Sequence, residues 1–265
     1  MNIRLSNPKW SKLNTLSPSR LNAFFSCGIK FEMSYVYDFQ QPFGISAHRG
    51  SGVHKAIEED NRHFKEKGER LDIKSLLEFG LTEFDEKIEK EGVFISPKDE
   101  EKRDKIIEKA RDQVIQAIRL YEAMEKPWVP AFIEESVQAD IGYPLVLNMR
   151  IDMIDTNHVI YDWKTYAKRT MHKHDIQSLL YCRAYEELSG FKPKFQYIDF
   201  ILKKEPEIDI QLLQDPTPEH YKRLDDLIEI YFKAIEADIF LPASKFDFLC
   251  SESSCAFWEQ CEYRI

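Results

Sequence analysis

The sequence predicts an α/β fold, in which helices precede and flank a core of strands. Two patterns predict this class. Over residues 98–126, apolar side chains recur every three or four positions, as on the buried face of an amphipathic helix. Over residues 131–164 the pattern changes to short runs rich in Val, Ile and Leu, separated by Gly, Pro, Thr and Asn, which is typical of strands and turns. No repeat or Gly/Ser-rich linker interrupts the 265 residues, so we expect a single domain.

The N-terminal half is predicted to be helical. Ser17-Pro18, an N-cap followed by Pro at the first helical position, predicts a helix that reaches Cys27. The segment 50–52, Gly-Ser-Gly, predicts the start of a second helix with its Ser as the cap. Charged but periodic residues predict further helices over 73–90 and 98–126.

The C-terminal half is predicted to mix strands with helices. Strand-like runs lie at 132–133, 137–141, 145–153, 159–161, 195–203 and 207–213. One helix is predicted from about Asp175 to Leu188, stopped by Gly190. Another is predicted from Thr217-Pro218 to about Asp238.

The net charge of −9, from 46 acidic residues against 37 Lys and Arg, argues at first against a nucleic-acid partner. The charge is unevenly distributed, however. Residues 1–57 hold seven basic and two acidic side chains, and residues 164–174 hold four Lys or Arg, two His and no acid. A phosphate backbone could meet the protein at these basic stretches, so DNA is retained as a partner.

No run of 18 apolar residues occurs, and the first eight residues lack the apolar stretch of a signal peptide. We therefore expect a cytoplasmic protein with no membrane partner. In that compartment, the five cysteines predict metal ligands, reactive thiols or buried side chains rather than disulfides.

A carboxylate–lysine group carries the clearest chemistry. Side chains alternate along a strand, so Asp162 and Lys164 would project to the same side. Pairing with the preceding strand would bring Asp152 close to them. Two carboxylates and a Lys favour a site for a hard divalent cation that acts on a phosphate. The alternative is a solvated strand face, which the apolar run before Asp162 and the following Trp163 disfavour.

The cysteines form a second group. Cys250, Cys255 and Cys261 have the spacing C-x₄-C-x₅-C, and Cys27 is a distant fourth. Thiolates select Zn²⁺ or an iron–sulfur cluster, and the spacing alone does not choose between them. The alternative is a set of buried apolar thiols, which is how we interpret Cys182.

Four motifs follow one another along the chain: Gly52-Val53-His54, Ile151-Asp152-Met153-Ile154-Asp155, Asp162-Trp163-Lys164 and Gln177-Ser178-Leu179-Leu180-Tyr181. Their order and spacing resemble the PD-(D/E)XK nucleases and, within them, the RecB-type branch. That branch includes the RecB and AddB nuclease domains and the CRISPR-associated iron–sulfur adaptation nucleases. The resemblance covers nearly the whole chain.

This resemblance implies a restriction-endonuclease-like core, with a central mixed sheet flanked by helices, an N-terminal helical segment and a Cys-ligated C-terminal tail. The single nuclease domain, 1–265, would then contain a helical segment at 58–126, an α/β catalytic core at 127–215 and a cluster-binding tail at 249–265.

The resemblance also implies roles for individual residues. The ligands of Mg²⁺ or Mn²⁺ would be His54, Asp152, Asp162 and the backbone carbonyl of Trp163. The catalytic residues would be Asp152, Asp162, Lys164, Gln177 and Tyr181, with Lys164 positioning the attacking water. Gln177 and Tyr181 would orient the site or touch the DNA backbone. Glu134 and Glu135, on the strand before, are interpreted as exposed strand carboxylates and are left out.

The cysteines correspond to the [4Fe–4S] ligands of AddB and the CRISPR-associated nucleases, which place one Cys in an N-terminal helix and three near the C-terminus. Here these would be Cys27, Cys250, Cys255 and Cys261. The sequence departs from the family at Gly28, where Pro is frequent, and in the first tail gap, which is four residues rather than two. The cluster would join the chain ends structurally.

The implied function is a metal-dependent DNA exonuclease acting on single-stranded ends in repair or recombination. The alternative is a non-catalytic iron–sulfur module that binds DNA ends or serves as a scaffold for a helicase or recombination partner. The intact Asp152, Asp162 and Lys164 argue against it. No G-x-x-x-x-G-K-[ST] motif occurs, so any unwinding would need such a partner.

Overall fold

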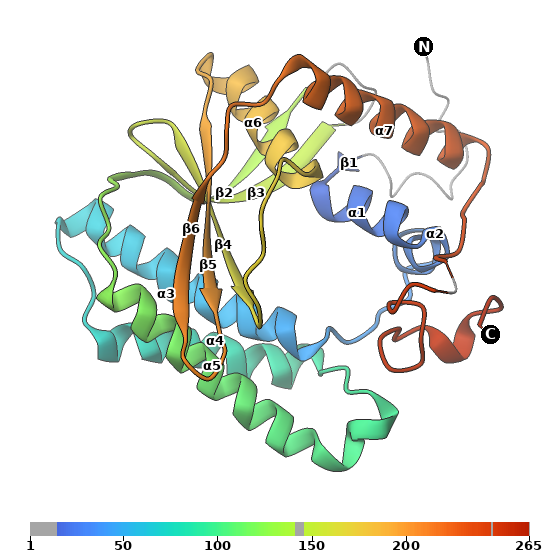
Figure 1. The fold of residues 1–265 in the computed structure, drawn as a ribbon, viewed down its shortest axis with the longest axis horizontal. Coiled ribbons are helices and arrows are strands. Elements are labelled where there is room, and N and C mark those ends of the chain that lie inside the picture. The colour runs from blue at the N-terminus through green and yellow to red at the C-terminus, as the bar shows by residue number, and fades with distance from the viewer. Residues whose placement is uncertain (1–14, 141–145, 245, 265) are drawn as a thin grey trace.

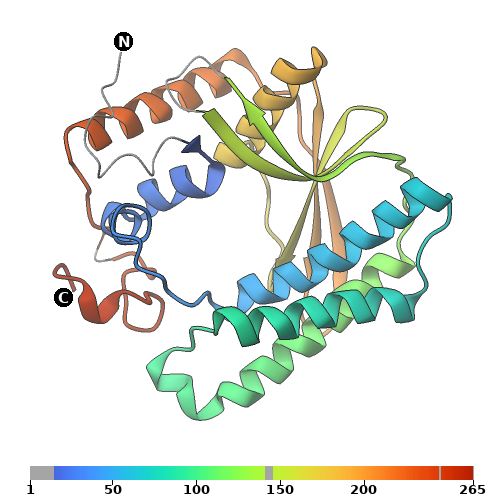
Figure 2. The same ribbon diagram turned by 180° about the vertical axis from the view of Figure 1, so that it is seen from behind.

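The computed structural model describes residues 15–140, 146–244 and 246–264, which form a mixed sheet with helices on both faces (Figures 1 and 2). Its strands are β1 Thr15–Leu16, β2 Pro130–Ala139, β3 Val146–Asp155, β4 Val159–Tyr166, β5 Lys194–Ile201 and β6 Glu207–Leu212. The strand order is β1-β3-β4-β5-β6, with β2 paired to β3. The β1–β3 and β4–β5 pairs are parallel, and the other pairs are antiparallel. This arrangement confirms the predicted mixed sheet flanked by helices.

Seven α-helices surround the sheet in the described part of the chain: α1 Pro18–Ser26, α2 Gly28–Phe31, α3 Ile45–Lys67, α4 Ile73–Glu91, α5 Arg103–Ala123, α6 Ile176–Ser189 and α7 Pro218–Glu236. Three shorter helical segments are the π-helix Glu32–Val36 and the 3₁₀-helices Pro97–Lys102 and Trp258–Gln260. None of the described helices is long and apolar enough to cross a membrane.

Each face of the sheet has its own apolar core. On one face, α1, α6 and α7 pack against β3 and β5, around buried residues such as Leu180 and Tyr231. On the other face, α3 and α5 pack against β4 and β5, and α4 packs on α3 and α5, around residues such as Val114 and Trp163. The sheet is therefore covered on both sides.

Several helix boundaries are confirmed. The Ser17 side chain accepts a hydrogen bond from the Arg20 N–H at the start of α1. Asp175 caps α6 in a reciprocal capping box, and Gly190 ends that helix in the left-handed conformation. These are the side-chain and glycine caps that the sequence predicts.

The predicted start of α3 is wrong. The helix begins at Ile45 rather than at residues 50–52, because Gly44 takes the extended N-cap conformation. Gly52 instead lies where α3 crosses α4: a Cβ there would stand 2.6 Å from the main-chain oxygen of Gly80. This glycine permits close helix packing and does not begin a helix.

The two runs predicted at 132–133 and 137–141 form the single strand β2, which pairs with β3 along most of its length. The predicted turn at Gly142 and Pro144 lies outside the described residues, as do residue 141 of the second run and residue 145 of the next. The short strand β1 was not predicted. It adds two residues beside the beginning of β3 and ties the N-terminal segment to the sheet.

Candidate active site

The register of β2 and β3 places two acidic residues side by side. Ile133 pairs with Met153, and Glu135 pairs with Ile151. Glu134 therefore lies opposite Asp152. The backbone of Glu134 has a φ of 49°, in the left-handed region that non-glycine residues rarely adopt. Such a conformation costs about 1–3 kcal/mol and persists where surrounding contacts fix it.

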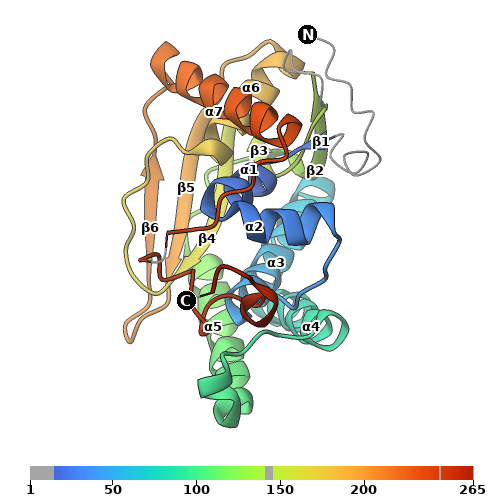
Figure 3. The ribbon, with the colours of Figure 1, turned by 90° about the vertical axis from the view of Figure 1, so that its right-hand side faces the viewer.

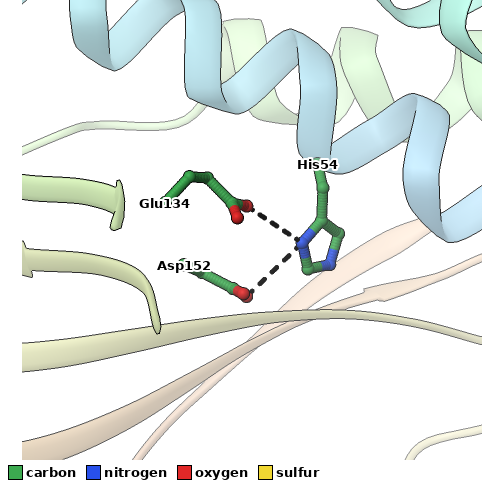
Figure 4. A group of neighbouring side chains, drawn as sticks. All are labelled: His54, Glu134 and Asp152. Atoms are coloured by element: carbon green, nitrogen blue, oxygen red, sulfur yellow. Dashed lines mark ion pairs between the residues drawn. The ribbon is translucent and has the colours of Figure 1, made fainter. Parts of the chain in front are cut away.

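Helix α3 brings His54 to this pair of carboxylates (Figure 4). The Nδ1 atom of His54 lies 3.5 Å from Asp152 Oδ2 and 3.6 Å from Glu134 Oε1. One ligand atom from each of the three residues lies within 4.8 Å of the other two. Two carboxylates and an imidazole suit Mg²⁺ or Mn²⁺, so the donor set fits a divalent cation.

The other ring nitrogen of His54 is also engaged. Its Nε2 lies 2.8 Å from the main-chain oxygen of Trp163, which can accept a hydrogen bond from it. This leaves Nδ1 facing the carboxylates. Burial works to lower the pKa of His54, but Asp152 and Glu134 outweigh it and raise the pKa to about 9. The hydrogen bond from His54 Nε2 to the Trp163 main-chain oxygen is of the kind that orients a metal-ligating imidazole.

Asp162 and Lys164 lie on the neighbouring strand β4. Asp162 is completely buried, and its Oδ2 lies 2.8 Å from Lys164 Nζ, without hydrogen-bond geometry. The backbone N–H of Trp163 donates to Asp152 Oδ2 at 3.0 Å, so the two strands hold Asp152 beside Asp162, as the sequence predicts. The Lys164 ammonium therefore already balances the charge on this buried carboxylate oxygen.

The two groups shift each other's ionisation. Burial raises the pKa of Asp162 to about 7, against the opposing effect of Lys164. Burial works to lower the pKa of Lys164, but Asp162 and Asp152 outweigh it, so that pKa is raised. Lys164 is therefore protonated at neutral pH and can only donate hydrogen bonds.

Helix α6 adds Gln177 and Tyr181, one turn apart. Gln177 Nε2 donates to Asp162 Oδ1 at 2.7 Å, and Gln177 Oε1 accepts from Lys164 Nζ at 3.3 Å. The Tyr181 hydroxyl accepts from Gln177 and donates to the main-chain oxygen of Arg150 at 2.6 Å. Gln177 therefore joins α6 to both charged groups of β4, and Tyr181 joins it to β3.

Two pockets open beside these residues. One, of about 560 Å³, is lined by Gln177 and Tyr181 together with the polar side chains Arg20, Asn22 and Asn148. The other, of about 350 Å³, is lined by His54 and Glu134. Arg150 borders both. The smaller pocket therefore opens onto His54 and Glu134, whereas the larger one reaches only Gln177 and Tyr181, which contact the carboxylate group.

Glu134 is a member of the site that the sequence does not predict. Its side chain, expected on an exposed strand face, is only 10% exposed and faces His54. The signal was available in the strand register: once residues 130–139 are taken as one strand, Glu134 falls opposite Asp152. Glu135 is exposed, as expected.

Asp162 stands apart from the ligand group that contains His54, Glu134 and Asp152. Its two oxygens meet Gln177 and Lys164 instead. Of the four predicted metal ligands, His54 and Asp152 lie in this group, whereas Asp162 and the Trp163 carbonyl lie beside it. Glu134 is an additional member of the group.

The basic stretch 164–174 carries less unpaired charge than its composition suggests. Arg169 forms ion pairs with Glu207 at 3.4 Å and Asp209 at 3.8 Å. His172 is buried, and its Nε2 lies 2.8 Å from the fully buried Asp199. These contacts anchor the stretch to β5 and β6, so its positive charge is partly neutralised.

The cysteines predicted to act together are neighbours. The C-terminal tail lies beside α2, as three views agree (Figures 1, 2 and 3). Burial raises the pKa of Cys250, and the thiols of Cys27, Cys261 and Cys255 add to this effect. Cys182, by contrast, is fully buried in the apolar core, as its packing interpretation predicts.

Gly28 accounts for one departure from the family pattern. Its N–H donates to the main-chain oxygen of Leu241 at 2.7 Å, a bond that Pro could not make. A Cβ at Gly28 would stand 2.6 Å from the Leu241 nitrogen. The glycine therefore allows the segment leading to the tail to pack directly on α2.

Comparison with solved structures finds the same fold elsewhere. A protein from Eubacterium rectale named "Putative exonuclease", at 12% identity, covers 94% of this chain and 92% of its own with a TM-score of 0.59. The structure of SSO0001, at 16% identity, covers 64% and 83% with a TM-score of 0.36, too low to carry an argument. No curated protein matches the chain.

The family comparison is more specific, and it agrees with the acidic, lysine-bearing strands described above. The family model for the PD-(D/E)XK nuclease superfamily matches residues 15–262, which include the carboxylate group and the four neighbouring cysteines. Members of this superfamily use divalent metals. The chain belongs to the PD-(D/E)XK nuclease superfamily.

Proposed function

We propose that this nuclease is a divalent-metal-dependent DNA exonuclease of the RecB type that acts on single-stranded ends. The observation that carries the proposal is the convergence of His54, Glu134 and Asp152 within metal-binding distance, next to the Asp162–Lys164 pair. The name of the Eubacterium rectale protein supports the exonuclease activity. The motif order that resembles RecB and AddB supports the single-stranded substrate.

Within this proposal, the cation would be held by His54, Glu134 and Asp152, with Asp162 and the Trp163 carbonyl beside them. When bound, Mg²⁺ or Mn²⁺ supplies Lewis-acid chemistry that stabilises charge on the scissile phosphate and lowers the pKa of water. The protein's own contribution is to hold these oxygens and the imidazole in a fixed arrangement before the cation arrives.

Lys164 provides the positive hydrogen-bond donor. Because Asp162 and Asp152 keep it protonated, it orients the attacking water or a phosphate oxygen and does not remove a proton. Gln177 limits its movement by accepting from Nζ while donating to Asp162. The Gln177 amide thus fixes the relative position of the two charged groups.

We also propose that Cys27, Cys250, Cys255 and Cys261 hold a [4Fe–4S] cluster. Their mutual influence on the pKa of Cys250 supports a shared centre. The resemblance to AddB and the CRISPR-associated nucleases favours a cluster over a single zinc ion.

The nuclease proposal is tested with labelled linear single-stranded DNA, circular single-stranded DNA and Mn²⁺. We expect the wild type to degrade the linear strand and spare the circle. Asp162→Ala and Lys164→Ala should abolish cleavage, whereas Lys222→Ala, an exposed residue of α7, should not.

Two results would contradict the proposal. If the wild type does not cleave, or if the Asp162 and Lys164 variants cleave equally well, the chain is not a nuclease, and a DNA-end-binding module for a helicase partner becomes the better interpretation. Cleavage of the circle would instead show an endonuclease.

A further inference from the structure

Arg150 lies beside the carboxylate group without belonging to any of the four motifs. It precedes Asp152 by two residues on β3, so both side chains project from the same face of the strand. Its Nε lies 2.6 Å from Glu134 Oε2 and also donates to the main-chain oxygen of Glu134 at 3.1 Å. One guanidinium therefore holds both the side chain and the backbone of the same residue.

The residue that Arg150 holds has a strained backbone. Glu134, with its φ of 49°, needs surrounding contacts to stay in the left-handed region. The bond to its main-chain oxygen is such a contact, because it fixes the peptide that follows the strained residue. The bond to Oε2 leaves the second oxygen, Oε1, directed at His54.

Arg150 is itself anchored to α3. Its Nη2 lies 3.5 Å from Glu58 Oε1, on the same helix as His54 and one turn further on. Glu58 is 9% exposed and is also paired with Arg62 and Lys55. The contacts thus run from α3 through Glu58 and Arg150 to Glu134, which in turn faces α3 again at His54.

An exposed ion pair contributes little to stability, and the Arg150 side chain is 58% exposed. Its charge also has the wrong sign for a role in attracting a metal. A guanidinium next to a metal ligand repels the incoming cation, so on charge alone its removal should tighten metal binding. Any favourable effect on metal binding must come from geometry.

We infer that Arg150 is a positioning residue that holds the carboxylate and the strained backbone of Glu134 in place for the divalent cation. The inference rests on the proposed metal-binding function of this site. The main-chain oxygen of Arg150, which accepts a hydrogen bond from the Tyr181 hydroxyl, is kept in any substitution. The role of the Arg150 side chain can therefore be tested separately.

Mn²⁺ binding to the purified protein, measured by isothermal titration calorimetry without DNA, tests this role. We expect Arg150→Ala to bind Mn²⁺ about 10- to 100-fold more weakly, as for other residues that orient a metal ligand. Arg150→Lys keeps the charge but loses the planar guanidinium, and it should also bind more weakly than wild type. Arg62→Ala is the matched control, because Arg62 pairs with the same Glu58 but its other hydrogen bond goes to the Ile133 main chain.

A double-mutant cycle separates positioning from general destabilisation. In a Glu134→Gln background, adding Arg150→Ala should cause no further loss of Mn²⁺ affinity. Equal or tighter binding by Arg150→Ala, or wild-type affinity in Arg150→Lys, would overturn the inference. No Mn²⁺ binding by the wild type would instead overturn the proposed metal site itself. Circular dichroism and the melting temperature establish that each variant is folded.

Discussion

The carboxylate group and the cysteine group are built in different ways. Around His54 and Asp152, three strands and two helices meet, and side chains are fixed by ion pairs and hydrogen bonds. The cysteines lie at the end of α1 and in a tail of turns with one short 3₁₀-helix, Trp258–Gln260. The first group is organised by the sheet, whereas the second relies on chain segments that few regular elements hold.

This difference indicates what each bound group would do. A cation would enter a site whose ligands already face one another. A cluster would join Cys27 to the tail and so contribute to the fold itself. Removing the cation and removing the cluster should therefore have different consequences, and three measurements can test this difference.

The largest effect is expected from Cys261→Ser. A cross-link over a loop of more than 100 residues restricts the unfolded chain by about 4–5 kcal/mol. The melting temperature should therefore fall by about 10 °C. The variant should also lose the visible absorbance of an iron–sulfur centre. Treating the wild type with EDTA under conditions that spare the cluster should lower the melting temperature by much less.

Cys182→Ser is a useful comparison, since it disturbs packing but no cluster ligand. It should keep the absorbance. If Cys261→Ser lost the absorbance yet melted like the wild type, the structural role of the cluster would be wrong, and the two groups would not differ as described.

A smaller effect is expected from Gln177→Ala. This substitution removes the bonds to Asp162 and Lys164 but leaves both charged groups and the ligands of the cation in place. A hydrogen bond to a charged group is worth about 1.5–3 kcal/mol, so cleavage should slow by at least about tenfold. Single-turnover cleavage of labelled DNA measures this, and an unchanged rate would show that β4 alone positions the pair.

The smallest effect is expected from pH. Carboxylates raise the pKa of His54 to about 9, and burial raises that of Asp162 to about 7. Since both folded-state values exceed those of the unfolded chain, both contributions to stability are lost as pH rises. The Asp162 contribution is lost mostly between about pH 4 and 7, and the His54 contribution between about pH 6.5 and 9. Metal-free protein should therefore melt a few degrees lower at pH 9.5 than at pH 6, mainly because of His54.

Mn²⁺ should reduce that decline, because it replaces the proton on His54 and offsets the negative charge of the carboxylates. His54→Asn should lose the part of the decline that lies between about pH 6.5 and 9. A melting temperature that stays constant from pH 6 to 9.5 in the metal-free wild type would contradict the charge assignments.

The sequence allowed the strands of the site to be identified, since alternation along β4 correctly joined Asp162 to Lys164 and the predicted pairing brought Asp152 beside them. Glu134 was not predicted because its position opposite Asp152 depends on the register between β2 and β3. The sequence shows β2 as two separate short runs, so this register could not be inferred from it. The backbone of Glu134 also has a positive φ, which the sequence gives no sign of, because Glu is not a residue that favours this conformation.

Gly52 shows a second limit of the same kind. From the local sequence, Gly52 next to Ser51 predicts a turn or a helix cap. The position of α4 shows instead that a larger residue would collide with the Gly80 main-chain oxygen. Contacts between distant segments, including the bond from Gly28 to Leu241, cannot be inferred from local patterns. Local rules therefore located the elements, and the distances between them came from packing.

The Gly52–Gly80 crossing has a consequence for variation in this protein. Because His54 follows Gly52 by two residues on α3, the separation of the two helices determines how far the imidazole reaches towards the sheet. A methyl group at position 80, on a helix that supplies no ligand, would stand 2.9 Å from the Gly52 main-chain oxygen. It would push α3 away from α4 and so displace the His54 imidazole relative to its carboxylates. Inherited or engineered changes that reduce the activity can thus arise well outside the recognisable motifs, on the far side of a helix.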